Sequence, residues 1–268
     1  MFSTIVLLKK EGYQTLPRRP LEKRKLRYED VYPVLYLKYR LSRQAERSNI
    51  KHLVIDEMQD YSRLQYLIIR RMFSCKMTIL GDRAQTMADQ QQDVLQFLPG
   101  IFGKDLRRIE MRKSYRNTVE IASYAANLIG VTDLELFERH GMPVLERDVT
   151  DLEAALREAV DTLFPDEKTY ETAAVIVPDE KTAERAYLIL REILAEKDFD
   201  CEKRLSWLNR DSSSFKKGLT VTTFYLAKGL EFDQVFSIFP KDEKREIMMQ
   251  AQYIAATRAL HELRVYHI

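Results

Sequence analysis

Short apolar runs that alternate with longer helical patterns are the feature that most constrains the fold of this chain. The apolar runs are 52–55, 77–80, 173–177, 219–223, 235–239 and 263–266. Helical patterns lie between or beside them at 63–73, 117–130, 181–196 and 243–260. Strands that alternate with helices build parallel sheets with helices on both faces. The sequence therefore predicts an α/β fold, with a boundary near residue 107 that separates a domain at 1–106 from a domain at 107–268.

Two of the expected helices carry capping signals at their start. Asn117 with Glu120, and Thr150 with Glu153, have the spacing of a capping box. We therefore expect the side chains of Asn117 and Thr150 to cap the helices that follow them.

The composition is that of a globular protein in a reducing compartment. Of 268 residues, 45% are hydrophobic and 31% charged, with 14 tyrosines and 12 phenylalanines, which argues against disorder. The net charge of +2 does not indicate a nucleic-acid-binding protein, although a local basic groove is compatible with it. Cys75 and Cys201 lie far apart and lack metal-ligand spacing. No apolar run has the length of a membrane span, so we expect a cytoplasmic protein with no membrane partner.

The strongest local signal is the acidic pair Asp56-Glu57 at the end of the run 52–55. Ligands of α/β sheets bind outside the carboxyl ends of the strands, so these carboxylates are expected to face such a crevice. One carboxylate can hold Mg²⁺ on a nucleotide, and the next can orient the attacking water. A charged loop after a strand is the alternative interpretation of the same residues.

Two weaker patterns follow the next strand and the domain boundary. The segment 81–85, Gly-Asp-Arg-Ala-Gln, makes a turn in which the amide of Gln85 is able to sense a terminal phosphate. The segment 114–116, Ser-Tyr-Arg, offers the ring of Tyr115 for stacking on a base and the guanidinium of Arg116 for phosphoryl charge. Taken alone, an ordinary turn and an ordinary surface pair explain them as well.

Two further patterns lie near the end of the chain. In the segment 227–233, Gly229 lets the backbone approach a ligand, and the carboxylate of Glu231 suits a ribose hydroxyl. A polar turn between strands is the alternative there. The segment 252–259 places Arg258 near the end of the helix expected at 243–260, where a solvated helical arginine is the default interpretation.

Together and in order, these patterns resemble motifs II, III, IV, V and VI of the UvrD/Rep-like superfamily 1 helicases. The matching segments are Asp-Glu-x-Gln-Asp at 56–60, Gly-Asp-x-x-Gln at 81–85, Ser-Tyr-Arg at 114–116, Ala-Lys-Gly-Leu-Glu-Phe-Asp at 227–233 and Tyr-x-x-x-Thr-Arg-Ala at 253–259. The resemblance implies a RecA-like P-loop NTPase fold with parallel sheets flanked by helices. The stretches 35–40 and 257–263 are similar to the HelD-like branch, whose members associate with RNA polymerase.

The resemblance also implies catalytic roles, residue by residue. Asp56 would bind Mg²⁺, and Glu57 would be the catalytic base. Gln85 would couple the γ-phosphate of ATP to domain movement. Arg116 and Arg258 would be the arginines that reach this phosphate from the second RecA-like domain.

The remaining implied roles concern the nucleotide and the nucleic acid. Tyr115 would stack on adenine, Gly229 would lie against the nucleotide, and Glu231 would bind its ribose. The residues that would face a nucleic-acid strand or the domain interface are Thr223, Tyr225 and Lys228.

The chain departs from the family pattern at the phosphate-binding loop. No Gly-x-x-x-x-Gly-Lys-Ser/Thr segment occurs in the sequence, so it lacks the Walker A cradle for the phosphates of ATP. We therefore expect a truncated first RecA-like domain with an exposed sheet edge, a complete second domain, and no activity of this chain alone. Tyr225 stands where the family usually has a histidine, and Ala88 where it often has an aromatic residue, which weakens the expectation of strand binding there.

These observations favour part of a UvrD-like ATP-dependent DNA helicase or translocase, which couples ATP hydrolysis to movement on DNA or to remodelling of a DNA-bound complex. Its expected cofactors are ATP and Mg²⁺. Its expected partners are DNA, single-stranded or at a duplex junction, RNA polymerase, and a missing N-terminal half that carries Walker A. The alternative is a non-catalytic module derived from a HelD-like helicase that binds RNA polymerase or DNA. An unrelated nucleotide-binding α/β protein is a weaker alternative, because two arginine motifs are present.

Overall fold

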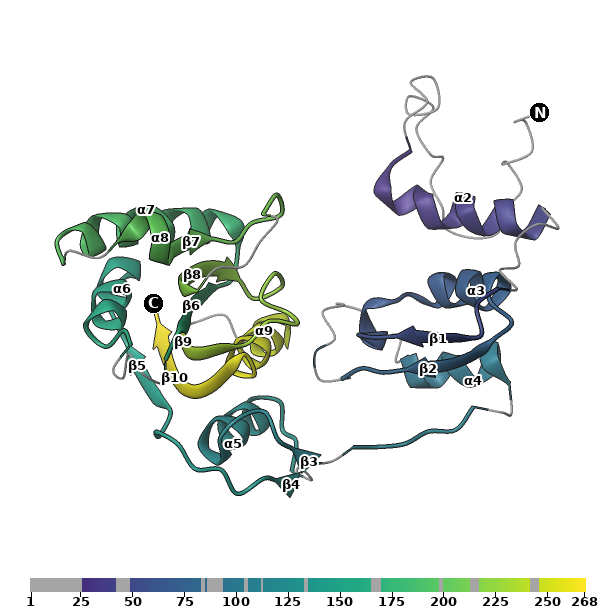
Figure 1. The fold of residues 1–268 in the computed structure, drawn as a ribbon, viewed down its shortest axis with the longest axis horizontal. Helices are drawn as coiled ribbons and strands as arrows, with labels where there is room; N and C mark the ends of the chain where they lie inside the picture. Colours follow the sequence, from purple (N-terminus) through teal and green to yellow (C-terminus); the bar gives the residue numbers. More distant parts are fainter. Residues whose placement is uncertain are drawn as a thin grey trace. The chain divides into compact units, whose positions relative to one another are not determined.

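The computed structural model describes residues 26–41, 49–82, 85, 94–103, 106–111, 113–132, 135–164, 170–197, 200–212, 217–241 and 246–268 (Figure 1). Ala88 lies outside the described residues. The chain divides into two compact units, of which unit 1 is drawn from Met1–Gly81 and Gln92–Leu106 and unit 2 from Asp82–Gln91 and Arg107–Ile268. Within the described ranges, no helix combines the length and the apolarity needed to cross a membrane.

Unit 1 is a two-stranded parallel sheet with helices packed on one face. Its elements are α2 (Tyr28–Leu41), β1 (His52–Ile55), a short 3₁₀ helix (Met58–Asp60), α3 (Arg63–Met72), β2 (Lys76–Ile79) and α4 (Val94–Phe102). The register of the parallel pair sets Ile55 opposite Ile79. Helices α3 and α4 cover this pair through a core that includes the fully buried Tyr66, and α2 packs on α3.

The strands of unit 1 are half-buried, although the apolar runs 52–55 and 77–80 favour burial on both faces. In β1 only Ile55 is buried, whereas Val54 is 60% exposed. Strand β2 alternates in the same way between more and less exposed residues. Both runs are apolar enough to suggest burial on two faces, but among the described elements α3 and α4 cover only one face.

Unit 2 is a larger α/β unit. Its elements are β3 (Lys113–Ser114), α5 (Val119–Leu128), β4 (Glu135–Leu136), β5 (Leu145–Asp148), α6 (Leu152–Asp161), β6 (Thr172–Val177), α7 (Glu180–Ala195), α8 (Cys201–Arg204), β7 (Leu205–Trp207), β8 (Gly218–Thr223), β9 (Phe232–Phe239), α9 (Glu246–Ala256) and β10 (Ala259–His267). Six strands form one parallel sheet in the order β5-β10-β9-β6-β8-β7, and β3 pairs separately with β4.

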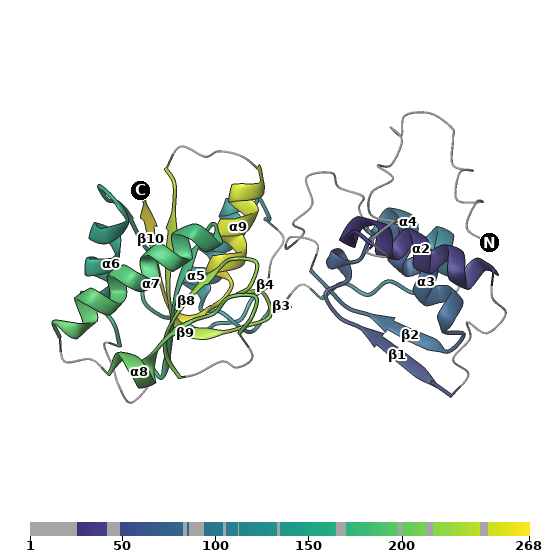
Figure 2. The same ribbon diagram turned by 90° about the horizontal axis from the view of Figure 1, so that it is seen from above.

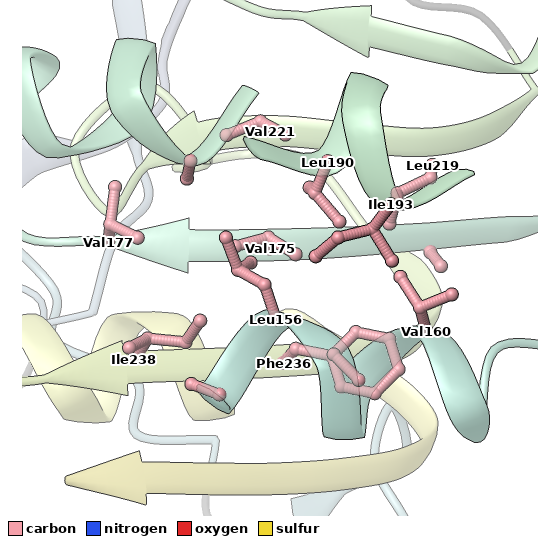
Figure 3. Close-up of a cluster of buried hydrophobic side chains, with 14 of the residues drawn as sticks. Leu156, Val160, Val175, Val177, Leu190, Ile193, Leu219, Val221, Phe236 and Ile238 are labelled. Carbon is pink, nitrogen blue, oxygen red and sulfur yellow. The ribbon is translucent and has the colours of Figure 1, made fainter. Parts of the chain in front are cut away.

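Helices cover both faces of the six-stranded sheet (Figure 2), and a hydrophobic cluster lies between the sheet and each helical layer. Successive side chains of a strand point to opposite faces, so the residues of β6 divide between the clusters. Val175 and Val177 pack with α6 and α7, whereas Ala174 and Ile176 pack with α5 and α9. Figure 3 shows the first cluster, in which Leu190 of α7 lies over the strands. The sheet is thus held between two helical layers.

The predicted fold class, a RecA-like α/β fold with parallel sheets flanked by helices, is confirmed by this topology. The predicted caps are each wrong by one residue, because Thr118 caps α5 and Asp151 caps α6. The helix expected at 243–260 is also shorter, since α9 ends at Ala256 and β10 begins at Ala259. The division into a truncated first domain and a complete second domain stays a prediction.

The core of unit 2 provides a test of its packing. Leu190 is fully buried in the cluster between α7 and the sheet, so Leu190→Ala removes packed atoms and leaves a cavity. We expect this variant to lower the free energy of unfolding by about 2–5 kcal/mol. Leu188 lies on the same helix but is 53% exposed. Leu188→Ala should change the free energy by about 0.5 kcal/mol or less. Urea unfolding followed by circular dichroism measures both, and equal losses would contradict the assignment of the core.

Candidate functional site

The acidic pair follows β1 in a strained turn. Glu57 has a left-handed backbone (φ 53°, ψ 51°), which is uncommon for a residue other than glycine. Its backbone N–H donates to Asp56 Oδ1 at 2.8 Å, and Gln59 Nε2 donates to Glu57 Oε2 at 2.6 Å. The backbone N–H of Met58 then donates to the carbonyl of Leu80, which follows β2, at 2.8 Å. The turn is therefore fixed against the neighbouring strand of unit 1, with Asp56 exposed at its start.

Gly81 allows the chain after β2 to pass close to this turn. A Cβ at position 81 would lie 2.6 Å from the backbone nitrogen of Met58 and would also collide with the side chain of Gln59. Tyr66 holds the same turn from the core side, because its hydroxyl donates to the carbonyl of Met58 at 3.0 Å. Position 81 therefore has no room for a side chain, which explains why glycine stands at the start of the segment 81–85.

Tyr115 lies exposed on unit 2 beside a second ring. Its ring, 61% exposed, lies 5.4 Å from that of Phe137, which follows β4. The ammonium of Lys113 lies 5.5 Å from the Tyr115 ring and 5.8 Å from the Phe137 ring. The backbone N–H of Phe137 donates to the carbonyl of Ser114, which fixes the two segments together. The Tyr115 ring thus packs beside Phe137, and the part of its surface that remains exposed is accessible to a flat ligand.

Arg116 and Glu231 form an ion pair with each other. The Nε atom of Arg116 lies 2.7 Å from Oε1 of Glu231, and the two side chains are 44% and 43% exposed. An exposed pair of this kind contributes about 0–1 kcal/mol, so a charged ligand can replace either partner at low cost. Arg139 donates to the carbonyl oxygens of Arg116 and Leu260, which ties the backbone of this segment to β10.

Arg258 is buried, which makes the default interpretation of a solvated helical arginine wrong. It lies in the turn between α9 and β10 and is 1% exposed. Its guanidinium donates to the carbonyl of Ile254 at 3.2 Å and to that of Leu230 at 3.3 Å. It also donates to Thr257 Oγ1 at 3.0 Å and to Gln85 Oε1 at 3.4 Å. Arg258 therefore joins residues of the third, fifth and sixth motifs inside unit 2.

Asn117 joins the fourth motif to the sixth, a role that the sequence prediction of a helix cap missed. Its side-chain amide donates to the carbonyls of Thr257 and Ala259 at 3.2 and 2.6 Å. The register places Ala259 opposite Phe232, so these contacts lie at the amino ends of β10 and β9. Arg116 precedes Asn117 in the sequence, and Glu231 precedes Phe232. Both therefore lie at the same end of the sheet. In the sequence, this role of Asn117 is indicated by its position directly after Tyr115 and Arg116, and not by its spacing from Glu120.

The other predicted site residues, which lie at the end of β8 and in the loop that follows it, differ in their exposure. Gly229 is exposed and has a left-handed backbone (φ 83°), and Lys228 is half-buried. Thr223 ends β8 and is almost fully buried, and within the described part of the chain its hydroxyl has no hydrogen-bond partner. Tyr225 is half-buried, with the Arg210 guanidinium 6.0 Å from its ring centre. Tyr225 and Lys228 are therefore more accessible to a ligand than Thr223.

A single carboxylate is the candidate for Mg²⁺. Among the residues that the structure describes, no group of three or more histidine, cysteine, aspartate or glutamate side chains is placed to hold a metal ion. Asp56 is exposed at the carboxyl end of β1, and Mg²⁺ is commonly held by one or two carboxylates together with phosphate oxygens. The chemistry of this position fits a Mg²⁺ ion that arrives with a nucleotide, and it does not fit a resident metal centre.

Glu120, in the first turn of α5, provides a pH-dependent test of the segment that carries Tyr115 and Arg116. Its carboxylate lies 3.0 Å from Nδ1 of His140 and accepts from the backbone N–H of Gly141 at 2.9 Å. The hydrogen bond with His140, aided by backbone N–H groups of Glu120 and Gly141, lowers the pKa of Glu120 from 4.5 to about 2. Because the pKa is lowered in the folded state, the stabilisation is present above pH 4.5 and is lost as the pH falls toward about 2.

We therefore expect Glu120→Gln to flatten the loss of stability between about pH 4.5 and pH 2, measured by urea unfolding across that range. Glu153→Gln is the matched control, since Glu153 lies in the first turn of α6 and pairs with Arg157 on the exposed surface. A pH profile for Glu120→Gln identical to that of the unaltered chain would show that these bonds do not stabilise the fold.

Comparison with known proteins finds a family model and solved structures that are similar to parts of the chain. Residues 10–87 match the model of the UvrD/REP helicase N-terminal domain. No curated protein matches the chain. Among solved structures, it is similar to the C-terminal domain of a possible DNA helicase from Lactobacillus plantarum WCFS1, with 24% identity over 58% of this chain and 88% of that one and a TM-score of 0.45.

Viral helicases are also similar in part. Arterivirus nonstructural protein 10, a helicase, matches with 15% identity over 80% of this chain and 38% of that one, with a TM-score of 0.41. Its complex with DNA matches with 15% identity over 83% and 41% of the two chains, with a TM-score of 0.43. The chain thus spans about two fifths of the length of these viral proteins. The family match covers the second and third motifs and confirms, for residues 10–87, the resemblance to the UvrD/Rep-like superfamily 1 helicases.

Proposed function

We propose that this chain supplies the catalytic carboxylates and the arginine-bearing unit of a UvrD-like ATP-dependent DNA helicase or translocase. The observation that carries the proposal is the grouping of Arg116, Glu231 and Arg258 at the amino ends of β9 and β10, with Tyr115 exposed next to Arg116. A ring for a base, a carboxylate for a ribose and guanidinium groups for phosphates are the side chains that a nucleotide requires. In this proposal, residues 1–106 are the remainder of the first RecA-like domain and residues 107–268 are the second.

The proposed chemistry assigns one task to each group. Bound Mg²⁺ neutralises charge on the phosphates of ATP, and the carboxylate of Asp56 would hold it. Glu57 would orient the attacking water and accept its proton, and its left-handed backbone sets the direction of the carboxylate. Arg116 would stabilise negative charge on the transferred phosphoryl group once its pair with Glu231 opens. Glu231 would then accept a hydrogen bond from the ribose.

The DNA contacts proposed for Thr223, Tyr225 and Lys228 are judged by the exposure of their side chains. Tyr225 and Lys228 are half-buried and offer a ring and an ammonium to a strand. Thr223 is buried, so its hydroxyl would need a local rearrangement before it contacts a nucleic acid. Tyr225 and Lys228 are therefore the first residues to test for DNA binding.

The absent phosphate loop determines what the chain does by itself. The backbone N–H groups and the lysine of such a loop supply most contacts to the phosphates, and the sequence contains no such segment. We propose that the chain acts together with a segment that carries such a loop. Without it, the carboxylates and arginines of this chain hold a nucleotide only weakly.

A second candidate is a non-catalytic module of HelD-like ancestry that binds RNA polymerase or DNA. The observation that favours it is the engagement of both arginines, since Arg116 pairs with Glu231 and Arg258 is buried by its own unit. A stoichiometric complex with RNA polymerase that forms without ATP would support this candidate. It would not require any hydrolysis by the carboxylates.

Complementation tests the first candidate. Mixing this chain with a UvrD-like N-terminal segment that contains the phosphate loop is expected to give DNA-stimulated ATP hydrolysis, measured as phosphate release. Glu57→Gln keeps the size of the side chain but removes the base, so it should lower kcat by about 100-fold or more. Glu29→Gln, an exposed change in α2 of the same unit, should leave kcat unchanged. Hydrolysis that survives Glu57→Gln would exclude the assigned mechanism.

Nucleotide binding by the chain alone tests the role of the absent loop. Calorimetric titration with Mg²⁺-ATP is expected to give a dissociation constant of about 1 mM or weaker, which corresponds to a binding free energy of about −4 kcal/mol or one less favourable. Micromolar binding that is lost in Arg116→Ala would show instead that the groups of unit 2 hold a nucleotide without a phosphate loop.

A further inference from the structure

Two side chains that the motif assignments leave without a role, Asp82 and Tyr253, fix the position of Gln85. The carboxylate oxygen Oδ2 of Asp82 accepts from the hydroxyl of Tyr253 at 3.1 Å and from Nε2 of Gln85 at 3.0 Å. Gln85 Oε1 in turn accepts from Nη2 of Arg258 at 3.4 Å. All four residues belong to unit 2. The hydrogen bonds run from Tyr253, in the last turn of α9, through Asp82 and Gln85 to Arg258, which follows α9.

The backbone supports this arrangement on both sides. On one side, the N–H of Gln85 donates to the carbonyl of Asp82 at 3.2 Å, which closes the turn between them. On the other, the N–H of Thr257 donates to the carbonyl of Tyr253 at 3.0 Å, so one turn of backbone connects Tyr253 to Arg258. Gln85 is buried, and its amide therefore needs these partners. The third motif is thus attached to the sixth at two points.

The chemistry of Asp82 determines which way the Gln85 amide faces. A glutamine amide has a donor end and an acceptor end, and it can turn by half a rotation to exchange them. An ionised carboxylate only accepts, so it selects the NH₂ end of Gln85. The carbonyl end must then face Arg258, whose guanidinium only donates. Neither orientation would be selected if both neighbours were able to donate and accept.

Tyr253 is a stable donor in this arrangement. Burial raises the pKa of the Tyr253 hydroxyl above its ordinary value, and the negative charge of Asp82 raises it further. The hydroxyl therefore keeps its proton at neutral pH and donates it to Asp82. This hydrogen bond occupies one lone pair of Asp82 Oδ2 and leaves another lone pair to accept from Gln85.

From this geometry we infer that Asp82 and Tyr253 are positioning residues, which hold the third motif on α9 and turn the carbonyl of Gln85 toward Arg258. The consequence for catalysis rests on the proposed function, in which Gln85 responds to the terminal phosphate. The hydrogen-bond arrangement itself does not depend on ATP, and it can be tested in the chain alone.

The first test uses side-chain amide signals in nuclear magnetic resonance spectra of the ¹⁵N-labelled chain. In the unaltered chain, the NH₂ signals of Gln85, assigned by their absence in Gln85→Ala, are expected to show slow exchange with solvent. Asp82→Ala removes the partner of the buried amide, and Tyr253→Phe removes the hydroxyl that holds this partner, so each variant should increase the exchange rate by about 10-fold or more. Unchanged exchange in both variants would overturn the inference.

Two further variants separate orientation from general destabilisation. Asp82→Asn retains an acceptor but no longer selects one end of the amide, so its exchange rate should lie between those of Asp82→Ala and the unaltered chain. Tyr124→Phe removes a hydroxyl that donates to Glu146 Oε1 at 3.2 Å between α5 and β5. It should leave the Gln85 signals unchanged. An increase equal to that of Tyr253→Phe would indicate loosening of unit 2 as a whole and would contradict a specific role.

The second test uses the complemented enzyme. Tyr253→Phe should lower kcat by about 3- to 10-fold with KM for ATP changed less than about 2-fold, because the variant alters the response of Gln85 and not the binding of ATP. Absence of hydrolysis in the unaltered mixture would count against the proposed function and leave the exchange test valid. Hydrolysis unaffected by Tyr253→Phe, together with unchanged exchange, would reject the positioning role alone.

Discussion

The buried guanidinium of Arg258 needs acceptors within unit 2, because a charge withdrawn from water is costly unless it is hydrogen-bonded or paired. The acceptors come from the segment before β9, from the end of α9 and from Gln85. These three segments belong to three different motifs, and their hydrogen bonds to the Arg258 guanidinium bring them together. Asn117 adds the fourth motif to the same turn by donating to the carbonyls on either side of Arg258. The order of motifs along the chain thus becomes a compact arrangement in space.

The path of the chain explains why this arrangement lies where it does. Segment 224–231 runs from the carboxyl end of β8 to the amino end of β9 without a helix, and it covers one face of the sheet. The predicted site residues between positions 223 and 231 are therefore spread along the length of the sheet. Thr223 stands at one end, and Glu231 at the other. Glu231 and its neighbour Leu230 lie with Arg116 and Arg258 at the amino ends of β9 and β10.

Much of the fold follows from local patterns, whereas most of the site contacts do not. Apolar runs predict β6, β8 and β9 because these strands are buried on both faces. The same rule overstates the burial of β1, whose Val54 faces solvent. Patterns of residue type also indicate Arg116, Glu231 and Arg258 as chemically important. They do not reveal that Arg116 pairs with Glu231, or that Asn117 binds residues 140 and 142 positions away, because such contacts depend on the tertiary path of the chain.

The backbone of Glu57 sets stability against the proposed chemistry at one position. A left-handed conformation costs an ordinary residue roughly 1 kcal/mol or more relative to glycine, which adopts it without penalty. A redesign guided by stability alone would therefore replace Glu57 with glycine. The result would be a protein that folds more firmly and has lost the carboxylate that its turn presents. An unusual backbone angle is thus a guide to the residues that an engineer of thermostable variants should leave untouched.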